Sequence, residues 1–194
     1  NWSEGPDGGH GAYGQIGGGT ANAGIFVGGF NGSHAAQDDT TEWDGTVFYA
    51  ASNMPAGKGS HHQGGTQNAT WIAGGTCYVF PATTDVAEGL VYDGTTWSES
   101  DALPIVVKTG LGTGTTNAAL QAGGAPTSPV DTRTLAHEYN GTTWQRVNSL
   151  NSNQHKEGGM SGTQASALAV GGYIVGHTEQ YVTTAIKTIS CDGL

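Results

Sequence analysis

The chain has 194 residues, of which 34 are Gly and 11% are charged, and its 16 acidic against 6 basic residues give a net charge of −10. The few basic residues are scattered, which excludes a surface for nucleic-acid phosphates or an anionic membrane, because both need clustered Lys and Arg. No apolar stretch approaches the ~18 residues of a membrane span, and the glycines lack the three-residue period of collagen. We therefore expect a globular chain without a nucleic-acid partner or membrane insertion.

Four short apolar runs recur along the chain, each between turn signals and each followed by a Gly-Gly pair. The runs are Ala23–Val27, Ala69–Ala73, Ala118–Ala122 and Ser166–Val170. Five-residue apolar runs of this kind are typical of buried strands. A Gly-Thr pair precedes every run by a few residues, at Thr20, Thr66, Thr115 and Thr163. The Gly-rich stretch that ends at each Thr predicts a further strand, so that each unit begins with two strands.

A second repeated signal predicts the other half of each unit. It consists of the tripeptides Trp43-Asp44-Gly45, Tyr92-Asp93-Gly94, Tyr139-Asn140-Gly141 and Cys191-Asp192-Gly193. Asp-Gly and Asn-Gly favour a two-residue type I′ hairpin, in which both central residues have positive φ. We therefore expect a third strand to end at each tripeptide and a fourth to follow, carrying Phe48, Trp97 and Trp144.

The repeats predict an all-β chain in which a four-stranded antiparallel unit of about 48 residues occurs four times. One such sheet cannot bury both faces, so we expect the units to pack around an axis as a four-bladed β-propeller. Residues 1–194 then form a single domain, with repeats of about 1–48, 49–97, 98–144 and 145–194. Trp2 lies at the repeat spacing from Cys191 when the chain end is joined to its start, so Asn1–Ser3 is the predicted fourth strand of the last blade and closes the ring. Two chains pairing into an eight-bladed ring is the alternative.

The repeats resemble those of the kelch-type β-propellers, in which a Gly-Gly pair is followed by a Tyr and then a Trp. The form Tyr92–Trp97, repeated nearly unchanged as Tyr139–Trp144, is similar to kelch-like repeats of tailed-bacteriophage virion proteins. The resemblance covers the whole chain and implies a virion or extracellular location. Cys191 and Phe48 depart from the aromatic pattern.

Kelch propellers include enzymes, so we compared equivalent positions on the first strands, which converge on the axis. The two columns are Ile16, His62, Leu111 and Gly159, and Gln15, His61, Gly110 and Gly158. Neither supplies three metal ligands. We therefore expect no catalytic residue, no metal and no cofactor. A small kelch-type enzyme using His61, His62 and His155 is the alternative.

The glycines of these first strands and the two cysteines of the chain are expected to have structural roles. Gly17, Gly18, Gly64, Gly112 and Gly159 are expected to let the inner strands approach the axis closely. Cys77 and Cys191 fall in different blades, so a disulfide between them is not expected and both are predicted to be free thiols.

One face of the predicted propeller is built of uniform turns, and the other carries varied connections. Varied insertions on a repeat scaffold commonly carry function. The candidate contact residues on that face, chosen as aromatic or His side chains on polar loops, are His34, Tyr78, Phe80, Tyr173, His177 and Tyr181. Such side chains suit stacking against sugars or peptide side chains.

The sequence thus predicts a non-enzymatic binding module on a virion or outside the cell, with a glycan or a virion or cell-surface protein as its partner. The other hypotheses are a purely structural decoration repeat, which assembles with copies of itself without a ligand, and the small enzyme named above.

Overall fold

The computed structural model describes residues 4–8, 11–79, 82–126, 133–152, 157–172 and 178–183, without the side chains of Tyr78, Val79 and Pro126. The described chain contains strands and turns only, as predicted. No helix long and apolar enough to span a membrane occurs among these residues.

The first sheet follows the predicted order of strands. It consists of β1 (Ile16–Thr20), β2 (Ala23–Val27), β3 (Thr40–Trp43) and β4 (Phe48–Ala50), paired antiparallel in sequence order. Within it the predicted apolar run Ala23–Val27 is a strand with the predicted bounds.

The second sheet has the same meander with an added hairpin. Its strands are β5 (His62–Thr66), β6 (Ala69–Ala73), β9 (Gly89–Tyr92) and β10 (Trp97–Ser100). The connection between β6 and β9 forms the hairpin β7 (Thr76–Val79) and β8 (Ala82–Asp85), which the sequence pattern did not predict.

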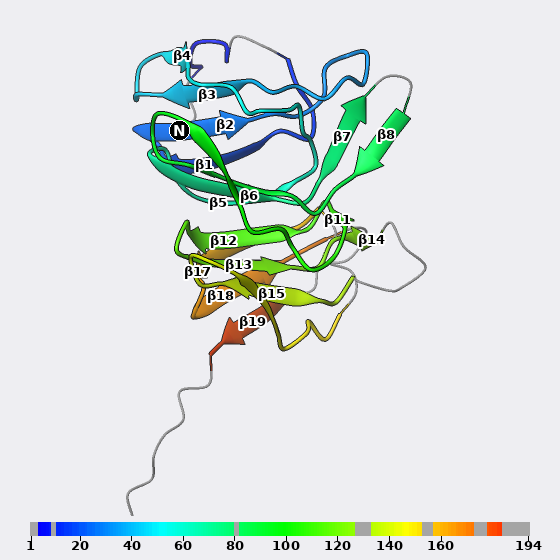
Figure 1. Ribbon diagram of the computed structural model, residues 1–194. Coiled ribbons are helices and arrows are strands. Elements are labelled where there is room, and N and C mark those ends of the chain that lie inside the picture. Colours follow the sequence, from blue (N-terminus) through cyan, green and yellow to red (C-terminus); the bar gives the residue numbers. More distant parts are fainter. Residues whose placement is uncertain are drawn as a thin grey trace, which may run out of the picture.

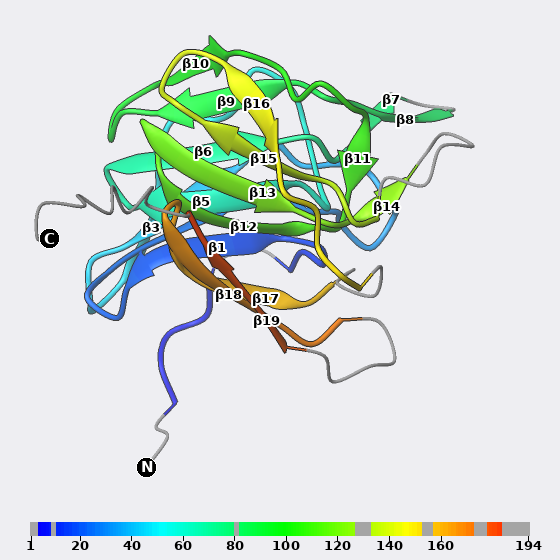
Figure 2. The same ribbon diagram turned by 90° about the horizontal axis from the view of Figure 1, so that it is seen from below.

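The third sheet repeats the arrangement, with β12 (Leu111–Thr115), β13 (Ala118–Ala122), β15 (Ala136–Tyr139) and β16 (Trp144–Val147). A two-residue strand before it, β11 (Val107–Lys108), pairs with β14 (Ala125–Pro126). Figures 1 and 2 show that β7, β8, β11 and β14 gather at one end of the sheets. We call this end the loop face.

The fourth sheet corrects one prediction. It contains β17 (Gly159–Thr163), β18 (Ser166–Val170) and β19 (Thr178–Val182). Tyr181 on β19 pairs with Ala167, in the register that Tyr139 and Ala119 have in the third sheet. The prediction that the third strand of this blade ends at Cys191 is therefore wrong, because the strand ends at Val182. The tripeptide at Cys191 has the turn signal of the repeat, whereas Tyr181 is not followed by Gly, which explains the error.

The four sheets are the blades of a β-propeller, as the sequence predicted. The inner strand β5 lies beside β1 and β12, and β12 lies beside β17, so the blades follow one another from the first to the fourth (Figure 1). The predicted closing strand Asn1–Ser3 lies outside the described residues.

Two apolar clusters fill the spaces between the first three blades. Between blades one and two, Trp97 packs on Tyr92 with ring centroids 5.1 Å apart, and its Nε1 donates to Oγ1 of Thr40 at 2.9 Å. Between blades two and three, Trp144 packs on Tyr139 at 5.0 Å and on Trp71 at 5.5 Å. The repeated Trp of the fourth strand thus packs the second and the third blade onto the blade before it.

The Asp-Gly hairpins differ from the predicted type I′ turns. Trp43 pairs with Phe48, so four residues form the loop, and Gly45 alone has positive φ, at 95°. Oδ1 of Asp44 accepts from the amides of Thr46 at 2.8 Å and of Val47 at 2.9 Å, which lowers the pKa of Asp44. In the other two hairpins, Oδ1 of Asp93 and Oδ1 of Asn140 accept the same two bonds from backbone amides. The carboxylate or amide, not the dipeptide alone, determines the turn.

Close packing of inner strands is confirmed for some of the predicted glycines. A Cβ at Gly64 would lie 2.7 Å from Nε1 of Trp71 and 2.9 Å from the carbonyl carbon of Thr113 on the next blade. A Cβ at Gly159 would meet no atom within 4 Å, so steric crowding does not explain that glycine.

Candidate functional site

One column of residues surrounds the axis at the loop face. Gly14, Ser60, Thr109 and Glu157 each lie two residues before the inner strand of their blade, and all four have a left-handed backbone, with φ of 64°, 54°, 55° and 63°. The amide of Ser60 donates to the carbonyl of Gly14 at 3.1 Å, that of Thr109 to Ser60 at 2.7 Å, and that of Glu157 to Thr109 at 2.9 Å. A chain of backbone hydrogen bonds therefore links the four blades. We call these four residues the axial ring.

Three members of the axial ring have a side chain where Gly would fit the backbone without strain. The left-handed conformation costs an L-residue roughly 1–2 kcal/mol, and for β-branched Thr109 it is a strong outlier. Strained residues that persist in a fold concentrate at functional sites. The side chains of Ser60, Thr109 and Glu157 are thus candidates for a role that the fold itself does not require.

These side chains surround the opening of a cavity along the axis. The cavity has a volume of about 630 Å³ and is lined by residues of all four blades, among them Ile16, Gln63, Leu111 and Met160. Nε2 of Gln63 donates to Thr70 at 3.2 Å, while its buried Oε1 has no hydrogen-bond partner among the described residues. Sites for small molecules have such volumes and few polar groups on apolar walls.

An aromatic rim borders the opening on the side of blade one. Tyr13 packs against Phe30 with ring centroids 5.4 Å apart, and its hydroxyl is hydrogen-bonded to Nδ1 of His34. Asn31 holds this loop, because its Oδ1 accepts from the amides of Ser33 at 2.9 Å and Ala35 at 3.0 Å. The predicted contact residue His34 is therefore fixed at the rim, and Tyr13 presents half of its surface to solvent.

The side of the rim formed by β8 and β11 carries an ion pair. Nζ of Lys108 contacts both carboxylate oxygens of Asp85, at 3.1 and 3.0 Å. Asp85 also accepts from the hydroxyl of Thr76 at 2.6 Å. Lys108, Thr76 and Thr83 line a depression of about 430 Å³ together with the aromatic rim and the axial ring. The rim thus offers an aromatic face, hydroxyl groups and charges of both signs.

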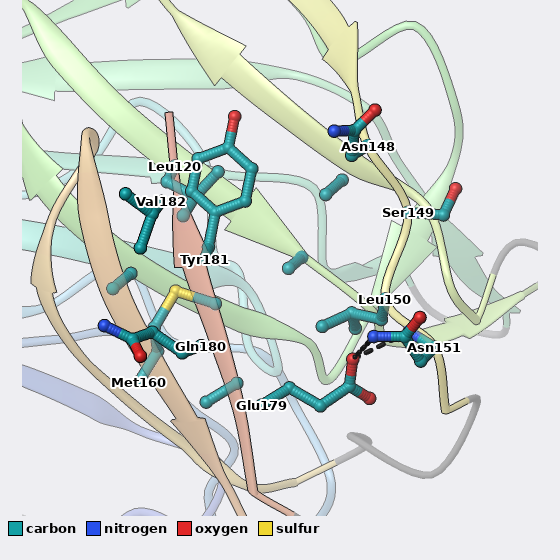
Figure 3. A pocket seen from close by; sticks show the side chains of 14 residues that line it. Leu120, Asn148, Ser149, Leu150, Asn151, Met160, Glu179, Gln180, Tyr181 and Val182 are labelled. Carbon is teal, nitrogen blue, oxygen red and sulfur yellow. Dashed lines mark hydrogen bonds between the residues drawn. The ribbon is translucent and has the colours of Figure 1, made fainter. Parts of the chain in front are cut away.

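The predicted contact residue Tyr181 lies elsewhere, in a cavity of about 370 Å³ between blades three and four. Figure 3 shows Tyr181, Leu120 and Met160 on one side of it and Leu150 and Asn151 on the other.

Tyr181 and Glu179, two polar side chains of this cavity, already have hydrogen-bond partners within the protein. The Tyr181 hydroxyl donates to Glu138 at 2.8 Å, and burial, with this bond, raises the pKa of Tyr181 to about 12. Glu179 accepts from the amides of Asn151 at 2.7 Å and Ser152 at 2.8 Å. We therefore regard the axial cavity and its rim as the better candidate site.

The other four predicted contact residues cannot be placed at either cavity. The backbone of Tyr78 belongs to β7 on the loop face, but its side chain lies outside the described part of the structure, as do Phe80, Tyr173 and His177.

The adjacent histidines of the enzyme alternative are fully buried between strands and do not line the axial cavity. Burial lowers the pKa of His61 to about 3 and that of His62 to about 4, so both are neutral at pH 7. His155 lies outside the described residues. In the described chain, no three His, Cys, Asp or Glu side chains gather as metal ligands would.

The sequence did contain a signal for the axial ring. Its members lie six residues before the repeat threonines Thr20, Thr66, Thr115 and Thr163, whereas the compared columns lay four and five residues before them. The identities Gly, Ser, Thr and Glu show no common chemistry, so backbone conformation is what reveals the column.

Comparisons with known proteins agree with the fold. No protein-family profile and no curated protein matches the chain. Among solved structures 145 chains match, including one described as the structure of YjhT, with a TM-score of 0.61 and 14% identity over 75% of this chain and 48% of that chain. The chain spans about half the length of that structure. At this identity, the likeness shows the fold alone.

Proposed function

We propose that the protein is a non-enzymatic binding module, displayed on a virion or outside the cell, that recognises a glycan at the mouth of its axial cavity. The observation that carries the proposal is the axial ring, in which Ser60, Thr109 and Glu157 keep side chains at left-handed positions beside a cavity of about 630 Å³.

The chemistry of the rim suits a sugar. Hydroxyl groups and a carboxylate exchange hydrogen bonds with sugar hydroxyls, and the exposed ring of Tyr13 offers an apolar face for stacking. Oε1 of Gln63, which has no hydrogen-bond partner among the described residues, supplies a buried acceptor in the cavity wall, and a bound donor would compensate its desolvation. A neutral, hydroxyl-rich ligand matches this set better than an extended apolar one.

The proposed location rests on the repeats. The Tyr92–Trp97 and Tyr139–Trp144 repeats are similar to kelch-like repeats of tailed-phage virion proteins, and a surface poor in charge is common among exposed proteins. A role in a phage particle or its fibre is the specific form of the proposal.

A glycan array followed by calorimetric titration of the best sugar tests the site. Thr109→Gly and Ser60→Gly should each weaken binding at least tenfold while leaving the melting temperature unchanged or higher, because Gly relieves the left-handed strain. Thr142→Gly makes the same change at the far end of blade three and should bind like the native chain.

Two outcomes would contradict the proposal. Binding that survives both axial substitutions would place the site elsewhere. A chain that retains no glycan on the array, but captures a virion or cell-surface protein or only assembles with itself, would overturn the proposed ligand.

A further inference from the structure

A lysine and a cysteine are held in contact beside the second blade. Gly59 and Thr76 form an isolated antiparallel bridge, in which each amide donates to the other carbonyl, at 3.0 and 2.9 Å. Lys58 and Cys77 are the next pair in this register, so their side chains leave neighbouring backbones side by side. Nζ of Lys58 lies 3.6 Å from Sγ of Cys77.

The surroundings prepare this pair for reaction. The side chain of Lys58 is only 1% exposed, and among the described residues its amine has polar contacts with Cys77 and with the carboxylate of Glu88, which it contacts as an ion pair. The side chain of Glu88 is 65% exposed and therefore connects the buried ammonium to water. Cys77 is only partly buried, as a reaction with a small oxidant requires. A thiol, an amine and a proton acceptor thus meet in one place.

We infer that Cys77 and Lys58 form a reversible covalent link when the protein meets hydrogen peroxide. The Cys77 sulfur first attacks one oxygen of the peroxide: a sulfur–oxygen bond forms, the oxygen–oxygen bond breaks, and the other oxygen leaves as hydroxide, which takes up the thiol proton and becomes water, so that Cys77 is a sulfenic acid. The Lys58 ammonium gives a proton to Glu88, and the freed amine attacks the Cys77 sulfur. A sulfur–nitrogen bond forms, the sulfur–oxygen bond breaks, and a second water leaves. Sulfenic acids condense with a neighbouring nitrogen in this way.

The link would join the connection between blades one and two to β7, whose Thr76 lines the rim depression. It goes beyond the proposed glycan binding, because it requires no ligand. A dithiol reverses it: one thiolate attacks the Cys77 sulfur and releases the Lys58 amine, and the second thiol restores the Cys77 thiol by closing a disulfide in the reagent.

Intact mass measurement on the full chain tests the inference, in a Cys191→Ser background that leaves a single thiol. One equivalent of hydrogen peroxide should remove two hydrogens from the folded protein, and peptide mapping should join Lys58 to Cys77. Dithiothreitol should restore the original mass. Lys108→Gln removes a partly exposed lysine that is paired with Asp85 and should leave the link intact.

Lys58→Arg should abolish the link, since a guanidinium is a poor nucleophile, and dimedone should then trap the sulfenic acid. If this variant does not fold, the native chain in denaturant serves instead, because loss of the bridge between Gly59 and Thr76 should give the dimedone adduct without a link. Oxygen addition to folded protein without a link, a link to another lysine, or an unreactive Cys77 would each overturn the inference.

Discussion

His62 on blade two and Gln121 on blade three are joined by a buried hydrogen bond, with Nε2 of His62 3.2 Å from the side-chain nitrogen of Gln121. Nδ1 of His62 lies 2.9 Å from the carbonyl oxygen of Ala73 and must donate to it, so Nε2 accepts from the Gln121 amide. Oε1 of Gln121 accepts in turn from Nδ1 of His137 at 2.9 Å. This chain of contacts requires the neutral form of His62 and is part of the interface between the two blades.

The buried histidines predict acid sensitivity. Burial lowers the pKa of His61 to about 3 and those of His62 and His137 to about 4, from the ordinary value of 6.5. Below pH 6.5 the unfolded chain binds protons on these histidines that the folded chain does not bind. The free energy of unfolding therefore has its full value above pH 6.5 and falls as the pH drops toward 4. Three such groups give a slope approaching about 4 kcal/mol per pH unit. Urea denaturation across a pH series checks this, and a flat profile from neutral pH to about pH 5 would contradict it.

Opposite effects are expected for substitutions at adjacent histidines. Both ring nitrogens of His61 are buried without a partner among the described residues, so His61→Leu should raise the free energy of unfolding by about 1 kcal/mol, because an unsatisfied polar group is removed. It should also reduce the number of protons taken up on unfolding in acid by about one, which lowers the slope of the free energy of unfolding against pH. His62→Leu strands the carbonyl of Ala73 and should cost about 1–3 kcal/mol. Chemical denaturation measures both, and equal effects would show that the partners do not matter.

A glutamine side chain that makes hydrogen bonds from one blade to the blade before it supports a third prediction. Nε2 of Gln67 donates to the carbonyls of Gly24 at 3.2 Å and Trp43 at 2.9 Å on blade one. Gln164 makes the same bonds from blade four to blade three. Gln67→Ala leaves two carbonyls without this donor and should cost about 1–3 kcal/mol by chemical denaturation.

Thr116 lies at the same turn position of blade three as Gln67 in blade two, and therefore provides the control for Gln67→Ala. Thr116→Ala should change stability by less than about 0.5 kcal/mol. If the two substitutions cost the same, the glutamine bonds do not stabilise the blade interface.

The seal between blades two and three depends on Trp144. The side chain is 7% exposed, and its Nε1 donates to the carbonyl of Asp101 at 3.2 Å. Trp144→Ala should lower the free energy of unfolding by about 3–5 kcal/mol because of the large cavity it creates. Trp144→Phe keeps much of the apolar contact and loses the hydrogen bond, and should cost less, about 1–2 kcal/mol. Thermal and chemical unfolding should rank the two in this order, and the reverse order would contradict the packing role.

The sequence predicts the strands of a blade well where a particular residue type, such as glycine with positive φ, ends the strand. The run Ala69–Ala73 is a strand with the predicted bounds, because the Gly-Gly pair after it supplies left-handed residues that end it. The third strand of blade four could not be located in this way. Tyr181 is identified by its pairing with Ala167, and pairing across a varied connection is a tertiary property that local turn signals do not encode.

The candidate site was predictable only in part. The sequence predicts His34 as a contact residue because it is a His on a polar loop, and the structure places it at the aromatic rim. The sequence does not predict Ser60 and Thr109 as site residues, because neither residue type suggests a left-handed conformation, and the hydrogen bonds between blades hold them in it. Lys58 and Cys77 are nineteen positions apart in sequence, and only the bridge next to them brings their side chains into contact.

In the axial ring, backbone atoms link the blades to one another, whereas side chains face the cavity. Its links use backbone atoms alone, so an exchange of side chain at Gly14, Ser60, Thr109 or Glu157 leaves every link in place. Residues that tolerate positive φ, such as Asn, Asp and Gly, can therefore be recombined at the four positions without redesigning a blade. A library of this kind would sample many recognition chemistries on one scaffold, and natural variants could change specificity by the same small steps.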